Sequence, residues 1–138
     1  MSVVLGYDES PGSARALRVA IDIAAAFGDP LVLVFGAAAR GTTGEEHRTH
    51  QEVIRQAGRI GLDHAVMMAD AAGVSTTVEV IDQKPAPALV EAAARHSARV
   101  IVVGTWGESP MRGALLGSTP HKLLHLSRVP VLCVPGEE

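Results

Sequence analysis

Residues 100–118 constrain the fold more than any other stretch, because a strand, a glycine-rich loop and a helix start follow one another there. The stretch begins Val-Ile-Val-Val, has glycine at 104, 107, 113 and 117, and runs into Ser118-Thr119-Pro120. A short run rich in β-branched residues is typical of a strand buried on both faces. Ser118 is a good helix N-cap, and proline is tolerated in a first helical turn. Closely approaching amides and unpaired helix donors together favour an anion such as phosphate.

Glycine content alone leaves a second interpretation open. Four glycines in a surface loop are also typical of tight turns that bind nothing. The sequence has no Gly-Lys-Ser/Thr, which excludes a Walker A loop, and it lacks the Gly-x-Gly-x-x-Gly fingerprint of dinucleotide-binding proteins. A phosphate site in this loop is therefore of another kind.

Apolar strands and helices alternate along the whole chain. Strands are predicted at residues 2–7, 31–35, 74–81, 99–103 and 131–134, and the intervening helices end near residues 27, 72, 96 and 127. Leu17, Ile21 and Ala24 share one face of the first helix. This alternation is typical of an α/β sandwich with a parallel sheet and right-handed crossovers.

The longest predicted helix covers about residues 45–72, after a flexible loop of small residues at 36–44. Residues four and three apart on this helix predict one buried stripe. The stripe consists of Val53, Ala57, Ile60, His64, Met67 and Ala71. Gly73 ends the helix, and the apolar–polar alternation of residues 74–81 is typical of an edge strand.

Length and composition limit the class of protein. With 138 residues, 47% of them hydrophobic and 20% charged, the chain is expected to form a single domain over residues 1–138. A net charge of −3 without a basic stripe, and 3% aromatic residues, argue against nucleic-acid binding. No apolar run approaches the ~20 residues that span a bilayer, so no membrane partner is expected.

Cys133 is the single cysteine and lies in a predicted apolar strand. It cannot form an internal disulfide, and without polar neighbours it is a poor nucleophile, so we expect a small core residue. A reducing, cytoplasmic setting fits best.

The glycine spacing matches a known signature. Gly104, two residues, Gly107, nine residues and Gly117-Ser118 resemble the nucleotide-binding motif of the ATP-binding branch of the universal stress protein family. The Pro130–Pro135 ending and the N-terminal strand resemble the family as well. The resemblance implies a Rossmann-like, adenine nucleotide alpha hydrolase-like fold, a three-layer α/β/α sandwich with a five-stranded parallel sheet in the order 3-2-1-4-5. That order reverses between the first and fourth strands, where open parallel sheets bind ligands.

The resemblance also implies a ligand site at the carboxyl ends of these strands. Asp8 would bind ribose hydroxyls or a metal on the phosphates, unless it only caps the following helix. Arg112 would neutralise phosphate charge or remain solvated. The implied ligand is ATP, or AMP or ADP, with Mg²⁺ held through the phosphates. The binding residues are Gly6, Tyr7, Asp8, Gly36, Val103, Gly104, Gly107, Arg112, Gly117, Ser118 and Thr119.

Three positions depart from the family pattern. Gly36 stands where the family usually has valine or a similar residue whose backbone reads the adenine edge, so it adds no wall to the site. Trp106 stands where His or Arg is common, and Gln83 stands where glycine is expected before a helix. These departures bear on adenine and ribose contacts and leave the phosphate loop intact.

Metal and hydrolase sites are weakly supported by the sequence. His121 and His125 lie four apart on the last predicted helix, a spacing that can hold zinc. No glutamate follows His121 and no third ligand is evident nearby, so the pattern favours a solvated helix face. No Gly-x-Ser-x-Gly elbow indicates a serine hydrolase.

The resemblance implies a stress-response sensor or switch that binds an adenine nucleotide and forms a homodimer by pairing Val131–Val134. Two alternatives stay open, a slow ATPase and a nucleotide-independent dimeric module that binds protein partners. We find no residue that would orient a hydrolytic water, so no catalytic residue is predicted. The intact glycine signature argues against the nucleotide-independent module.

Overall fold

Apolar strands and amphipathic helices alternate in the computed structural model, which describes residues 1–8, 11–36, 61–105 and 117–136. A helix at residues 61–71 lies between the second and third strands. The other elements are β1 Ser2–Gly6, α1 Pro11–Phe27, β2 Leu31–Gly36, β3 Thr76–Ile81, α3 Pro85–Arg95, β4 Ala98–Gly104, α4 Ser118–Leu126 and β5 Val131–Val134.

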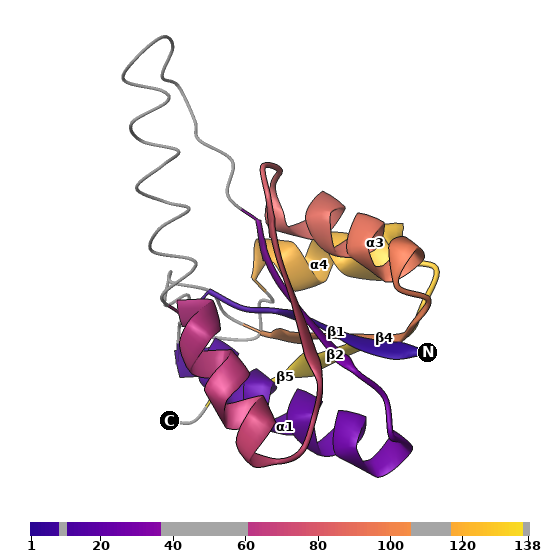
Figure 1. Cartoon of the computed structure of the whole chain (residues 1–138). Helices are drawn as coiled ribbons and strands as arrows, with labels where there is room; N and C mark the ends of the chain where they lie inside the picture. Colours follow the sequence, from indigo (N-terminus) through magenta and orange to yellow (C-terminus); the bar gives the residue numbers. More distant parts are fainter. Residues whose placement is uncertain (9–10, 37–60, 106–116, 137–138) are drawn as a thin grey trace, which may run out of the picture.

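The strands form one parallel sheet in the order β3-β2-β1-β4-β5. Val4 of the central strand lies opposite Val32 of β2 and Ile101 of β4. The helices α1 and 61–71 cover one face of the sheet, and α3 and α4 cover the other (Figure 1). The three-layer sandwich and the strand order 3-2-1-4-5 are therefore confirmed, with β3 and β5 at the edges.

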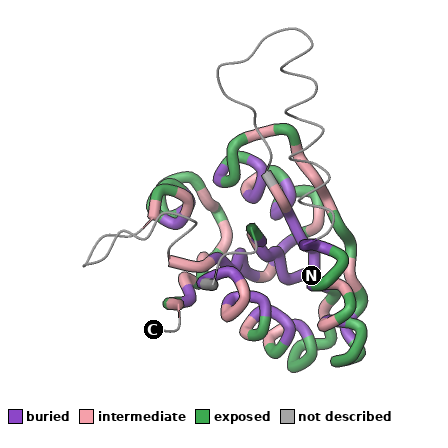
Figure 2. The backbone as a smooth tube through the Cα atoms, turned by 90° about the vertical axis from the view of Figure 1, so that its left-hand side faces the viewer, coloured by how far each residue is buried: buried purple, intermediate pink, exposed green. Residues whose placement is uncertain are grey.

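Successive residues of the strands face two separate cores. Val3 and Leu5 pack with α1 and with Leu62, whereas Val4 packs with α3. Because both faces of β1 are covered, the strand is a continuous apolar run and shows no alternation. Figure 2 shows the buried backbone along the sheet and on the helix sides that face it. On α1, the predicted face of Leu17, Ile21 and Ala24 is buried, as expected.

The helix at residues 61–71 packs through a face other than the predicted one. Leu62, Ala65 and Ala69 are buried, whereas His64 is exposed and Met67 is 71% exposed. The predicted stripe is therefore wrong over the described part of this helix, where Ala71 is exposed as well. Both sets of positions have helical spacing and both include alanine, so spacing alone could not select the face that contacts the sheet. Val53, Ala57 and Ile60 lie outside the described residues.

The element ends agree with the predictions to within two residues. Gly28 and Gly73 have φ values of +69° and +74° and follow the helix ends that were predicted near residues 27 and 72. The strand β1 ends at Gly6, one residue earlier than expected, and β2 extends to Gly36, which therefore belongs to the sheet. The rest of the predicted loop, residues 37–44, lies outside the described residues. No helix in the described ranges has the length and apolarity required to cross a membrane.

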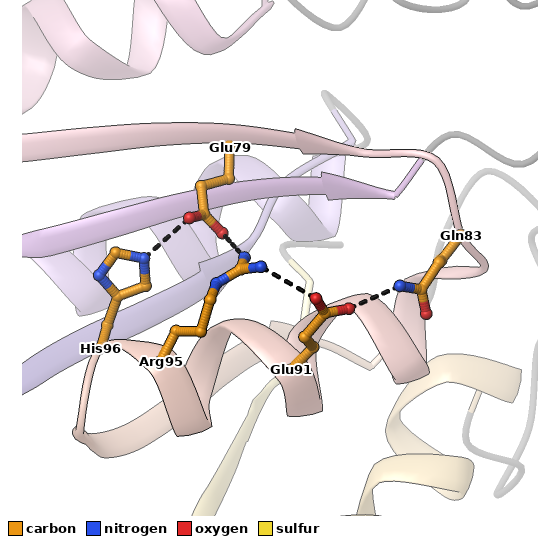
Figure 3. Close-up of polar contacts among 5 residues, drawn as sticks. All are labelled: Glu79, Gln83, Glu91, Arg95 and His96. Carbon is orange, nitrogen blue, oxygen red and sulfur yellow. Dashed lines mark hydrogen bonds and ion pairs between the residues drawn. The ribbon is translucent and has the colours of Figure 1, made fainter.

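A polar network joins the edge strand β3 to α3 (Figure 3). The Glu79 carboxylate contacts His96 Nε2 at 2.9 Å and also accepts a hydrogen bond from Arg95. Arg95 binds Glu91 at 2.9 Å, and Gln83 Nε2 donates to the same Glu91 carboxylate at 2.6 Å. Burial raises the pKa of Glu79, but its hydrogen bonds with His96 and Arg95 and the Arg95 charge outweigh burial and lower that pKa overall.

We expect Glu79→Gln to lower the free energy of unfolding by about 1 kcal/mol at neutral pH. A carboxylate whose pKa is lowered on folding stabilises the folded state above its ordinary pKa, 4.5 here, and this stabilisation is lost as the pH falls through the lower folded value. The difference between the two proteins should therefore shrink in acid. Urea unfolding from neutral to acid pH measures it, with the exposed Asp70→Asn as control. An undiminished difference in acid would contradict this role of Glu79.

Candidate functional site

The carboxyl ends of β1 and β4 lie side by side at the point where the strand order reverses. Leu5 of β1 is opposite Val102 of β4, so the residues that follow both strands leave the sheet at the same edge. The helix α1 begins shortly after β1, and α4 is the next described helix after β4. Open parallel sheets bind ligands at such a switch point.

The chain after β1 is fixed to the first turn of α1. The Asp8 N–H donates to the Ser13 hydroxyl at 3.0 Å, and Ser13 is buried with 3% exposure. Arg15 on the same helix donates to the Pro135 carbonyl at 2.8 Å, which holds the end of β5 beside α1. Asp8 is itself exposed, so a carboxylate stands at the switch point on a backbone held by its neighbours.

Gly104 allows α1 to approach β4 closely. A Cβ at this position would lie 3.0 Å from the Gly12 carbonyl carbon and 3.3 Å from the Ser13 nitrogen. A side chain here would press against the backbone of Gly12 and Ser13, which glycine avoids. The glycine that ends β4 therefore brings the first turn of α1 to the edge of the sheet where Asp8 lies.

Gly117 joins the end of β4 to the start of α4. Its N–H donates to the Thr105 carbonyl at 2.7 Å, and a Cβ on Gly117 would lie 2.9 Å from that same oxygen. Gly117 is also the N-cap of α4, so the predicted cap at Ser118 is wrong, and no side chain caps the helix. The bond to Thr105 ties the start of α4 to the end of β4, and it occupies the Gly117 amide that was expected to bind phosphate.

The first turn of α4 presents hydrogen-bond donors. Pro120 has no N–H and the Gly117 amide is used, which leaves the amides of Ser118 and Thr119 as the open donors of this turn within the described residues. Both side chains carry hydroxyls, Ser118 is exposed and Thr119 partly exposed, and the first turn has no acidic residue. The helix dipole adds positive potential here, so the turn suits an anion.

Thr105 is a candidate that the sequence analysis missed. Its N–H donates to the Val134 carbonyl at 3.1 Å and its carbonyl accepts from Gly117. Its side-chain oxygen is buried, and no group in the described residues forms a hydrogen bond with it. An unsatisfied buried hydroxyl costs about 1–3 kcal/mol, so a ligand that hydrogen-bonds with Thr105 would relieve this cost. A threonine between two signature glycines was the available signal.

Three predicted residues contribute backbone or packing. A Cβ on Gly6 would lie 2.9 Å from Leu89 Cδ1, so this glycine makes room for α3. Tyr7 is buried in the core on the α1 side, and its N–H donates to the Val34 carbonyl at 3.1 Å. Val103 is 3% exposed and belongs to the core under α3 and α4. The side chains of Tyr7 and Val103, and the lack of one at Gly6, therefore serve the fold.

The other predicted positions are divided between the sheet, α3 and the part of the chain outside the described residues. Gly36 pairs with Ile81 at the end of β2, two strands from β4 in the sheet order. Gln83 turns to Glu91 of α3. Gly107, Arg112 and Trp106 lie outside the described residues. Cys133 is partly buried, and burial raises the pKa of its thiol, so it stays protonated and is a poor nucleophile.

Comparison with known proteins assigns the family. Residues 1–135 match the Universal stress protein family, and the chain belongs to that family. A universal stress protein of Methanocaldococcus jannaschii is 29% identical over 140 residues, which cover 96% of this chain and 80% of that protein. One from Mycobacterium tuberculosis strain H37Rv is 33% identical, but the chain spans only 44% of its length.

Solved structures confirm the fold. A universal stress protein in complex with cAMP is 30% identical, with a TM-score of 0.77 over 99% of this chain and 98% of that one. The Archaeoglobus fulgidus universal stress protein in complex with dAMP has a TM-score of 0.73 at 23% identity, with 97% of each chain covered. The protein MJ0577 has a TM-score of 0.86 at 18% identity, covering 99% of this chain and 97% of that one. The last two likenesses show the fold alone.

Proposed function

We propose that this universal stress protein binds an adenine nucleotide at the carboxyl ends of β1 and β4 and acts as a stress-response sensor or switch. ATP is the favoured ligand because of the glycine spacing, with AMP and ADP as alternatives. The observation that carries the proposal is the start of α4. Within the described part of the chain, the Ser118 and Thr119 amides are open there and the buried Thr105 hydroxyl lacks a partner. A relative 30% identical to this chain has been solved with cAMP, an adenine nucleotide.

Phosphate is the part of the nucleotide that the described residues fit best. The Ser118 and Thr119 amides and hydroxyls would donate to phosphate oxygens at the positive end of α4. The Thr105 hydroxyl would supply one further donor from the end of β4. Gly107 and Arg112 would complete this contact, with Arg112 neutralising phosphate charge.

The ribose and base would extend toward β1 and β2. Asp8 is exposed at the switch point and would accept hydrogen bonds from ribose hydroxyls. The backbones of Tyr7, Gly36, Val103 and Gly104 would line this part of the site, with Gly6 giving α3 its space behind it. Mg²⁺ would be held mainly by the phosphates, because the described residues contain no cluster of three or more metal-binding side chains.

Calorimetric titration of ATP, ADP, AMP and cAMP, with and without Mg²⁺, tests this proposal. GTP serves as the control for selectivity toward the adenine base. A ligand that binds only the folded chain stabilises it by about 2.7 kcal/mol at a ligand concentration of a hundred times Kd, and the melting temperature rises accordingly. We expect an adenine nucleotide to bind and Thr105→Val to weaken it about tenfold, since one hydrogen bond to a charged group is lost. Failure of all four adenine nucleotides to bind would contradict the proposal.

We further propose that the chain forms a homodimer through β5. This strand is at an edge of the sheet, where backbone groups remain to be paired, and its Leu132 is 37% exposed. An apolar edge strand invites association, and burial against a second copy removes that liability. The pairing of Val131–Val134 across two copies would extend the sheet.

Leu132→Lys is expected to yield a monomer, because a charge at the centre of a paired edge opposes burial. Sedimentation velocity measures the change in mass. Val78→Lys is the matched control, since Val78 is 41% exposed on the opposite edge strand, β3. A dimer that survives Leu132→Lys and dissociates with Val78→Lys would place the interface on the other edge.

A further inference from the structure

We propose that His121 and His125 on α4 form a chelating site for a divalent transition-metal ion. The spacing alone favoured a solvated helix face, and both residues are exposed, but the structure adds a contact between their rings. The ring centroids lie 5.1 Å apart with the ring planes inclined at 70°. Nothing in the nucleotide proposal is needed for this inference, because it rests on the two imidazoles alone.

The helix supplies the geometry for chelation. Residues four apart have Cβ atoms about 5–6 Å apart on one face, and the two rings already meet there. An ion bound at ~2.0–2.1 Å by one nitrogen of each ring requires those nitrogens within about 4 Å of each other. The ring centroids are 5.1 Å apart, so rotation about the side-chain bonds would turn one nitrogen of each ring toward a shared ion.

The charges around the pair act in both directions. His125 lies in the last turn of α4, where the helix dipole favours a cation. Lys122 and Arg128 are exposed and lie close to the pair in sequence, and their positive charges disfavour a bound cation. No third His, Cys, Asp or Glu joins the pair within the described ranges, so water would fill the remaining positions. The site is therefore open and exchangeable.

The donor set selects the class of metal. Imidazole nitrogen suits Cu²⁺, Ni²⁺ and Zn²⁺, whereas Mg²⁺ and Ca²⁺ require oxygen ligands. The ring contact distinguishes the pair from the other two described histidines. His64 is exposed on the helix at 61–71, and His96 forms a hydrogen bond with Glu79. His47 and His50 lie outside the described residues.

Calorimetric titration of the untagged full chain with Ni²⁺, which does not oxidise the Cys133 thiol, tests the site. We expect His121→Gln and His125→Gln each to lower Ni²⁺ affinity at least about tenfold, and His64→Gln to leave it unchanged. Mg²⁺ should give no heat from this site. All three positions are exposed, so the variants should fold, and circular dichroism checks this.

Two further readouts separate chelation from loose binding. Ni²⁺ should raise the melting temperature of the wild type and not of either α4 variant, because the chelate forms only on the folded helix. Affinity should fall on acidification, since protons compete for the imidazole nitrogens. The inference is overturned if Ni²⁺ does not bind, if only one of the two α4 histidines matters, or if all variants bind alike.

Discussion

Replacing Gly117 with valine is expected to lower adenine-nucleotide affinity about a hundredfold or more while the sheet remains folded. A Cβ at this position meets the Thr105 carbonyl oxygen at 2.9 Å, so the 2.7 Å hydrogen bond from the Gly117 amide cannot persist. The start of α4 must then move, and the Ser118 and Thr119 amides move with it. Losing two hydrogen bonds to charged phosphate, at about 1.5–3 kcal/mol each, corresponds to a hundredfold or larger effect.

The matched control for this variant is Gly136→Val. A Cβ on Gly136 lies 3.6 Å from Gly12 Cα, an ordinary contact, although it is close to the same end of the sheet. Calorimetry gives the affinities, and circular dichroism reports the helix and strand content. Unchanged nucleotide affinity in Gly117→Val would mean that the ligand does not contact the start of α4.

The second large effect is on stability. Leu123→Ala is expected to lower the free energy of unfolding by about 2–5 kcal/mol, because Leu123 is fully buried and attaches α4 to the core under the sheet. Of the α4 residues, only Pro120 is buried with it. The cavity left by alanine therefore loosens the whole helix.

Leu124→Ala on the same helix provides the control. Leu124 is 54% exposed, so its removal should change stability by less than about 0.5 kcal/mol. Urea unfolding of both variants at equal protein concentration makes the comparison. Similar losses in the two variants would show that α4 is not held through Leu123.

The sequence carried the architecture because burial on both faces makes β1, β2 and β4 continuous apolar runs. Glycines with positive φ at 28 and 73 follow from local chemistry and were readable as helix ends. The strand order could not be predicted from the pattern, because an apolar run does not specify which strands pair with it. It came from the family resemblance and was confirmed by the pairing of β1 with β2 and β4.

The candidate site was less readable because its geometry depends on contacts distant in sequence. Gly104 faces Gly12 and Gly117 faces Thr105, so the signature glycines provide close approach between protein backbones. From the sequence, by contrast, we expected this close approach to serve the ligand. The unpartnered hydroxyl of Thr105 likewise depends on surroundings that spacing cannot show.

Local competition explains the remaining errors. Ser118 has the better capping chemistry, but the Gly117 bond to Thr105 places the helix boundary one residue earlier. On the helix at 61–71, Leu62 with two alanines contacts the core, and Met67 remains outside. Both outcomes were set by tertiary contacts, which override local preferences of similar size.

The central claim is that an adenine nucleotide binds between the ends of β1 and β4 and the start of α4. Titrating ATP or AMP into the isotope-labelled chain and following backbone amide resonances tests it most directly. We predict that the largest shifts occur at Asp8, Thr105, Ser118 and Thr119, and that amides at the amino-terminal ends of the strands, such as Ser2 and Ala98, stay unchanged. Shifts confined to another surface, or no shifts at millimolar nucleotide, would contradict the account.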